Sequence, residues 1–188
     1  MTAFTLPCEA VIGGVHYPIR ADFREILEIF SYLENSDLPD FIRWQVAMAL
    51  FYGGEIPQEH MQQAASYFQW FVNCAKPEDT GTGRKLLDWE HDAQMIIADV
   101  NKVAGQEIRA LPFVHWWTFM AWFHGVGEGQ LSTVISIRQK LQTGKKLEAW
   151  ERDYYRQNKA QIDLPHTYSR QEAEQKRRLL AQLGLGKT

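Results

Sequence analysis

Apolar residues recur every three to four positions through most of the chain, and this spacing favours α-helices over β-strands. In the segment 23–33 the recurring residues would form one helical stripe: Phe23, Ile26, Leu27, Phe30 and Leu33. Asp22 precedes this stripe, where a helix N-cap belongs, and Glu25 follows three residues later, as in a capping box. The pattern predicts a helix that begins after Asp22 and buries one face.

The same spacing recurs in further segments that are separated by Gly, Pro, Asn or charged residues. These segments lie at about 39–52, 57–72, 86–103, 112–123, 131–142, 146–160 and 169–183. The segment 39–52 is apolar on almost all sides, so we expect it near the centre of the fold. The segment 76–85 lacks the periodicity and contains Pro and two Gly, which is typical of a loop. Together these features predict a mainly α fold, a bundle of about seven or eight helices.

A short β-hairpin is expected at the N-terminus, within about residues 4–20. Residues with high strand propensity stand on both sides of Gly13-Gly14. Two adjacent glycines suit a two-residue turn, because both can adopt the positive φ angle that such a turn needs. A lone hairpin is only marginally stable in water, so we expect it to lie against apolar surface.

Length and composition divide the chain into two parts. A chain of 188 residues can form one domain with a self-supporting core. Aromatic residues end at Tyr168, and Pro165 interrupts the preceding linker. We therefore expect a compact helical body over residues 1–162, hairpin included, followed over residues 163–188 by a linker and a basic C-terminal helix.

The net charge of −3 hides an uneven distribution. Residues 1–137 contain eight basic and 17 acidic residues, a net charge of −9, whereas residues 138–188 contain 12 basic and six acidic residues, a net charge of +6. Near the C-terminus a basic cluster adjoins a narrow apolar stripe: Lys176, Arg177, Arg178, Leu179, Leu180 and Leu183. This helix is expected either to dock on the surface or to bind a partner, such as an acidic neighbour or the acidic groove of a sister subunit.

The segment LPFVHWWTFMAWFHG is the richest in aromatic residues. Trp116 and Trp117 are adjacent and would point about 100° apart on a helix, while Trp122 points in a third direction. One core does not easily receive three such indoles, so at least one should meet another chain or stay partly exposed. Because Trp is enriched at interface hot spots, the candidate partner-binding residues are Trp116, Trp117, Trp122, Lys176, Arg177 and Arg178.

We expect no catalytic, cofactor-binding or metal-binding residue, and hence no enzyme. None of the six histidines is three or four residues from another, as a helical zinc site requires. Asp88 and Asp92 share a helix face, but a solvated acidic edge beside a water-facing His91 is the expected environment. Cys8 and Cys74 lack a local signature of activation, so inert thiols are expected.

Composition also limits the cellular setting and the class of partner. The N-terminus has no basic and apolar signal segment, and no stretch approaches the roughly 20 apolar residues of a membrane span. We therefore expect a soluble protein of the cytoplasm that does not bind membranes. The acidic overall charge also argues against a dedicated nucleic-acid-binding protein.

Four segments in a fixed order resemble the bacteriophage gene-product-fifteen family of tailed phages and prophages of Gram-positive bacteria. They are IGGVHYPIRADFREIL, LLDWEHDAQMIIADV, LPFVHWWTFMAWFHGVGEG and a basic helical end that contains ISIRQK. The resemblance covers nearly the whole chain. It implies a non-enzymatic protein encoded between the tail-tube and tape-measure genes, a position typical of tail assembly chaperones.

The resemblance also implies how such a protein works. It would coat the phage tape-measure protein in the cytoplasm of the bacterial host, keep it soluble, and leave as the tube polymerises, so that it would be absent from the mature virion. Opposite charges at the two ends of this chain would favour self-association into a homo-oligomer or a head-to-tail spiral. The alternative is a small phage nucleic-acid-binding protein whose basic C-terminal third contacts phosphates.

Overall fold

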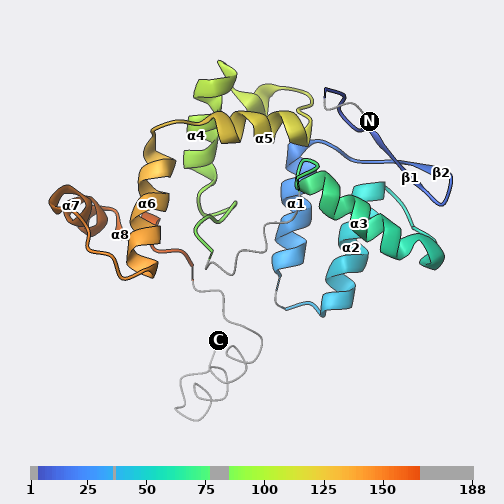
Figure 1. The fold of residues 1–188 in the computed structure, drawn as a ribbon, viewed down its shortest axis with the longest axis horizontal. Coiled ribbons are helices and arrows are strands. Elements are labelled where there is room, and N and C mark those ends of the chain that lie inside the picture. Colours follow the sequence, from blue (N-terminus) through green and yellow to red (C-terminus); the bar gives the residue numbers. More distant parts are fainter. Residues whose placement is uncertain (1–3, 36, 77–84, 166–188) are drawn as a thin grey trace, which may run out of the picture.

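The structure, a computed structural model, describes residues 4–35, 37–76 and 85–165. In these ranges the fold is mainly helical, with one antiparallel two-stranded sheet at the N-terminus, as predicted (Figure 1). The α-helices are α1 (Phe23–Glu34), α2 (Asp40–Tyr52), α3 (Met61–Val72), α4 (Ala93–Ala104), α5 (Trp116–Gly125), α6 (Gln130–Gln142), α7 (Ala149–Gln157) and α8 (Lys159–Ile162). Two 3₁₀ helices are η1 (Gln58–His60) and η2 (Ile108–Ala110).

The helices form an arch in which α4 and α5 stand between two groups (Figure 1). The strands and α1–α3 form one group, and α6–α8 form the other. Helix α1 packs along α2 and also contacts α5, while α4 contacts both α5 and α6. Helices α4 and α5 therefore join the two groups.

The hairpin forms where the paired glycines predicted it. Strands β1 (Glu9–Ile12) and β2 (Val15–Pro18) pair antiparallel, and Gly13 and Gly14 have φ angles of 58° and 81°. Ala10 and Ile12 are buried, and β1 contacts α3. Burial of one face of β1 supplies the apolar support that a short hairpin needs.

Most of the aromatic residues in the described ranges lie in the core or pack against it. The Phe23 ring of α1 stacks on the Phe119 ring of α5, with centroids 4.7 Å apart. Phe119 also stacks on Trp116, and the Trp89 ring lies 6.0 Å from Trp116. Such ring pairs add to the free energy gained by burying their surface, so α1, α5 and the segment before α4 share one aromatic core.

Among the predicted helices that begin later than expected, two are delayed by side chains that bind backbone N–H groups. The helix predicted from residue 86 begins at Ala93, because one Asp88 oxygen accepts the backbone N–H groups of Glu90 and His91 at 3.0 and 2.8 Å and holds a turn there. The helix predicted from residue 112 begins at Trp116, because the His115 ring accepts the Trp117 N–H at 3.0 Å and acts as the N-cap.

Two further expectations also differ from the structure. The predicted helix 146–160 is divided at Asn158, which separates α7 from α8 and whose side chain donates to the Tyr154 carbonyl. Asp22 caps α1 as predicted, but Glu25 pairs with Arg20 at 3.2 Å and forms no capping box. The predicted helix 169–183 lies outside the described residues, and the division of the chain at residue 162 stays a prediction.

Candidate functional site

The two adjacent tryptophans of α5 cap the end of α3. Trp116 is 1% exposed and donates from Nε1 to the Val72 carbonyl at 2.9 Å. Trp117 is half-buried and donates to the Phe71 carbonyl at 2.8 Å. Carbonyls in the last turn of a helix lack helical partners. The Trp116 indole therefore satisfies the Val72 carbonyl, while the Trp117 indole adds a second donor to the Phe71 carbonyl, which also accepts the Cys74 N–H at 3.0 Å.

This arrangement corrects the expectation for Trp116, which offers no surface to a partner. Trp117 and Trp122 stay partly exposed, as expected for at least one of the three indoles. Their contact with a partner stays a prediction. The basic candidates Lys176, Arg177 and Arg178 lie outside the described residues.

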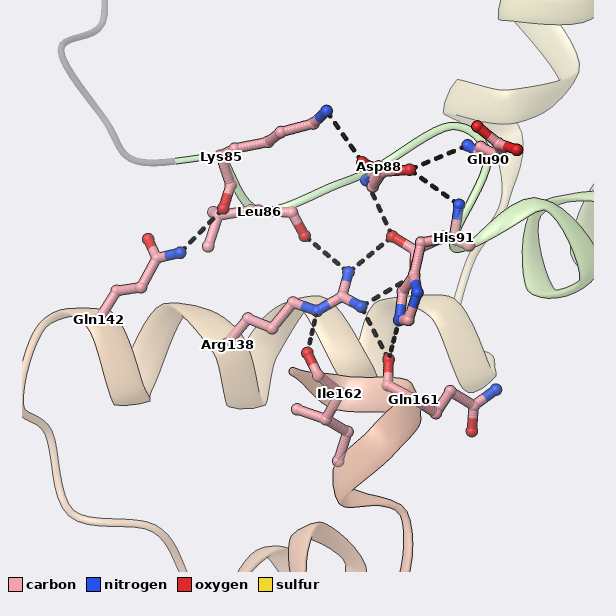
Figure 2. A network of polar contacts seen from close by, with 10 residues as sticks. Lys85, Leu86, Asp88, Glu90, His91, Arg138, Gln142, Gln161 and Ile162 are labelled. Atoms are coloured by element: carbon pink, nitrogen blue, oxygen red, sulfur yellow. Dashed lines mark hydrogen bonds and ion pairs between the residues drawn. The ribbon is translucent and has the colours of Figure 1, made fainter. Parts of the chain in front are cut away.

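A buried arginine links three separate segments of the chain. Arg138 of α6 is 3% exposed, and its two terminal nitrogens donate to the two oxygens of Asp92 at 2.6 and 2.8 Å. Its remaining donors reach the carbonyls of Leu86, Gln161 and Ile162 at 2.9, 2.9 and 2.6 Å (Figure 2). All five guanidinium N–H groups are therefore used, and the buried charge has a charged partner.

This network corrects two expectations about the segment before α4. Asp92 was expected on a solvated edge, but its side chain is fully buried and forms the ion pair with Arg138. His91 was expected to face water, but it is half-buried, with Nε2 3.0 Å from the Gln161 carbonyl oxygen. One signal in the sequence pointed to the network: Arg138 interrupts the apolar face that Val134 and Ile137 begin.

A second polar cluster joins the start of α1 to the segment before α5. Asp22 is 7% exposed, and its two oxygens accept the backbone N–H groups of Arg24 and Val114, each at 2.9 Å. The Arg24 side chain donates to both Asp22 oxygens and to the carbonyls of Leu111 and Pro112. Asp22 therefore caps α1 and at the same time holds Val114, 92 residues away.

The Asp22 cluster predicts a pH-dependent stability that Asp22→Asn should remove. Burial alone would raise the pKa of Asp22, but hydrogen bonds from Arg24 and Val114 outweigh burial and lower the pKa below its ordinary value of 3.8. Since the unfolded chain binds this proton more tightly, the stabilisation is present above pH 3.8 and is lost as the pH falls through the lower folded pKa. Melting temperatures between about pH 2 and 5 should fall less steeply on acidification for Asp22→Asn than for the wild-type chain; equal slopes would contradict this.

A third buried carboxylate holds the start of α6. Asp99 of α4 is 2% exposed and accepts the Leu131 N–H at 3.1 Å and the Lys102 ammonium at 2.6 Å. A Cβ atom at Gly129 would lie 2.7 Å from an Asp99 oxygen. Any residue larger than glycine at position 129 would therefore force the Asp99 carboxylate to shift.

These three clusters bring together the segments that carry the family resemblance. The DFR residues meet the LPFVH segment, and the DWEHDA segment meets the arginine of ISIRQK. Asp99 of the IIADV segment binds the N–H of Leu131, two residues after GVGEG. Their charged side chains serve as connections between loops and helices.

The described residues offer little for bond-making chemistry. They contain no group of three or more His, Cys, Asp and Glu side chains that could hold a metal ion. Burial raises the pKa of the Cys74 thiol to about 11, which keeps it protonated and weakly nucleophilic at neutral pH. The absence of enzymatic activity stays a prediction.

One surface groove, here called the acidic groove, lies between α1 and the turn before α4. It has a volume of ≈ 500 Å³ and is lined by Leu27, Glu28, Phe30, Ser31, Glu34, Asn35, Asp88, Trp89 and Glu90. The Lys85 ammonium lies 2.7 Å from Glu34 and 3.0 Å from Asp88. The groove therefore combines an apolar lining with an excess of negative charge.

A second groove, here called the apolar groove, lies between α2 and the start of α3. It has a volume of ≈ 750 Å³ and is lined by Phe41, Trp44, Gln45, Met48, Ala49, Gly54, Glu55, Ile56, Gln58 and Met61. Phe41 is 65% exposed and Trp44 is 38% exposed. Large apolar side chains on a shared, open surface are typical of a protein-binding site.

Comparison with known proteins identifies the family. No curated protein and no solved structure was found to match the chain. Within the described ranges, no helix combines the length and the apolar character that a membrane crossing needs. The family described as Bacteriophage Gp15 protein matches residues 5–164. Since this match covers most of the 188 residues, the chain is a bacteriophage protein that belongs to the Bacteriophage Gp15 protein family, as the resemblance implied.

Proposed function

We propose that this phage protein is a non-enzymatic tail assembly chaperone or adaptor that binds the tape-measure protein through the apolar groove. The observation that carries the proposal is the pair of exposed aromatic side chains on α2, in a chain whose family suggests a structural or assembly protein. Phe41, Trp44 and Met48 are spaced by three and four residues, so they share one face of α2. This face can receive the apolar stripe of an amphipathic helix.

The chemistry of the apolar groove suits reversible binding to a long partner. A tape measure is an extended helical protein that exposes apolar stripes until the tube encloses it. Met61, which lines the groove and is half-buried, is a flexible side chain that adapts to different apolar surfaces, so one groove can bind successive stretches of such a helix. Many weak contacts of this kind would release as the tube polymerises.

The remaining parts of the proposal follow from the same role. The protein would act in the cytoplasm of the bacterial host and be absent from the mature virion. Copies along one tape measure would lie next to one another, which allows a homo-oligomer or a head-to-tail spiral.

The nucleic-acid alternative has less support from the described residues. Three basic side chains of the C-terminal third form ion pairs within the chain: Arg138 with Asp92, Lys140 with Glu151 and Arg156 with Asp153. Charges that are already paired contribute less to phosphate binding and to its salt dependence. A mobility-shift assay at low salt tests this alternative directly.

Phe41→Glu should abolish most of the solubilisation of the tape-measure protein. Burying a Phe side chain contributes about 1.5–3 kcal/mol, so placing a charge there should weaken binding at least about tenfold. The measurement is the soluble yield of the co-expressed tape-measure protein and its co-purification with the chaperone.

Trp150→Glu is the matched control, because Trp150 is 58% exposed on α7, outside the apolar groove. This variant should retain the yield seen with the wild-type chain. No gain in soluble tape-measure protein with the wild-type chain would refute the chaperone role, and equal losses with both variants would refute the role of the groove.

A further inference from the structure

We infer that the acidic groove binds the basic C-terminal segment of the same chain, residues 169–183. This inference concerns an intrachain contact and does not depend on the tape-measure role. Three observations carry it: the uncompensated charge of the groove, its apolar lining, and the place where the described chain ends.

The groove has a negative charge that the described part of the chain does not neutralise. Lys85 pairs with both Glu34 and Asp88 but neutralises only one of the two charges, while Glu28 and Glu90 are exposed and form no ion pair within the described ranges. In Figure 2 the Glu90 carboxylate points away from the Arg138 network. The outer carboxylates are therefore available to a basic ligand.

The lining of the groove is apolar and only partly covered. Leu27, Phe30 and Trp89 are each half-buried, although they pack against the core. A ligand that matches the groove must therefore combine positive charge with apolar side chains. The sequence supplies this combination where Lys176, Arg177 and Arg178 adjoin the leucines at 179, 180 and 183.

The chain passes close to the groove four residues before its described end. The Gln161 carbonyl lies 3.0 Å from the ring of His91, whose chain neighbour Glu90 lines the groove (Figure 2). The network around Arg138 also fixes Ile162, three residues before the described end at Pro165. The next ten residues can span up to about 33 Å, so Lys176 can reach Glu28 and Glu90 of its own chain.

Zero-length carbodiimide crosslinking of the full chain tests the contact. The reagent joins a lysine amine to a carboxylate only when the two are in direct contact. We expect Lys176 to crosslink to Glu28 or Glu90, identified by mass spectrometry after digestion. A mixture of ¹⁴N-labelled and ¹⁵N-labelled chains distinguishes the sources, because an intrachain crosslink joins peptides of one isotope only.

A charge-swap series makes the test specific. Lys176→Glu, Arg177→Glu and Arg178→Glu together should remove the crosslinks and raise the solvent exchange of amides 88–90 at least roughly tenfold. Adding Glu28→Lys and Glu90→Lys should restore the crosslinks, with the lysine now on the groove. Lys145→Glu with Lys146→Glu is the matched control, since both side chains are exposed but lie outside the acidic groove. This control should leave the Lys176 crosslinks and the exchange of amides 88–90 unchanged.

Each outcome decides the inference once circular dichroism shows that the variants fold. Intrachain crosslinks that the charge swap restores support it. Crosslinks between isotopes would assign the groove to a second copy and overturn the intrachain contact. Crosslinks from Lys176 to other carboxylates, no crosslinks, or equal losses in the control would also overturn it.

Discussion

Arg138→Leu should lower the free energy of unfolding by about 3–5 kcal/mol, because it leaves the fully buried carboxylate of Asp92 without its counter-charge. The same change removes donors from the carbonyls of Leu86, Gln161 and Ile162. An unpaired buried polar group costs about 1–3 kcal/mol, so the whole α6–α8 group should loosen. Urea denaturation followed by circular dichroism measures the loss.

Two comparisons separate the buried pair from a general effect of losing an arginine. Arg156→Leu breaks the exposed pair with Asp153 and should cost about 0–1 kcal/mol. The double variant Asp92→Leu/Arg138→Leu removes the stranded charge and should recover roughly 2 kcal/mol relative to Arg138→Leu. A double variant that is less stable than Arg138→Leu would show that the charge of Asp92 is not what destabilises the single variant.

Trp116→Ala should be comparably destabilising, by about 3–5 kcal/mol, because it opens a cavity in the aromatic core between α1 and α5. It also removes the hydrogen bond to the Val72 carbonyl. For a chain of this length, the melting temperature should fall by roughly 10 °C, which thermal denaturation measures.

Trp122→Ala is the matched control from the same helix. Trp122 is half-buried, so its loss should cost well under half as much as the loss of Trp116. Equal losses for both variants would mean that Trp116 does not occupy the core. If Trp122 contacts a partner, its variant should instead lose binding while remaining folded.

Local patterns in the sequence predicted the elements whose causes are local. The paired glycines have the positive φ angles that the hairpin needs, and Asp22 caps the helix that the apolar stripe predicts. In the segment 86–92 the local pattern does not determine the structure. Its Leu86 and Trp89 fit a helical spacing, but the Asp88 carboxylate binds backbone N–H groups of the following residues and stabilises a turn instead.

The polar clusters could not be predicted because their partners are distant in sequence. Asp92 and Arg138 are 46 residues apart, and nothing near Asp92 distinguishes it from a solvated acid. The indoles of Trp116 and Trp117 were expected to diverge, yet both reach carbonyls at the end of α3, which a helical projection of α5 alone cannot show. Tertiary contacts thus place Trp116, one of the expected interface residues, in the core.

The Arg138 network also determines how far the chain can be shortened from its C-terminal side without losing a hydrogen bond of the network. Its acceptors include the carbonyl of Ile162, 24 residues downstream, and the family match stops at residue 164. A stop codon placed before Gln161 would delete the two carbonyls of Gln161 and Ile162 and leave the buried Arg138 side chain without these acceptors. A stop codon after Pro165 would keep every acceptor of Arg138. The shortest fragment worth expressing is therefore dictated by an arginine in α6.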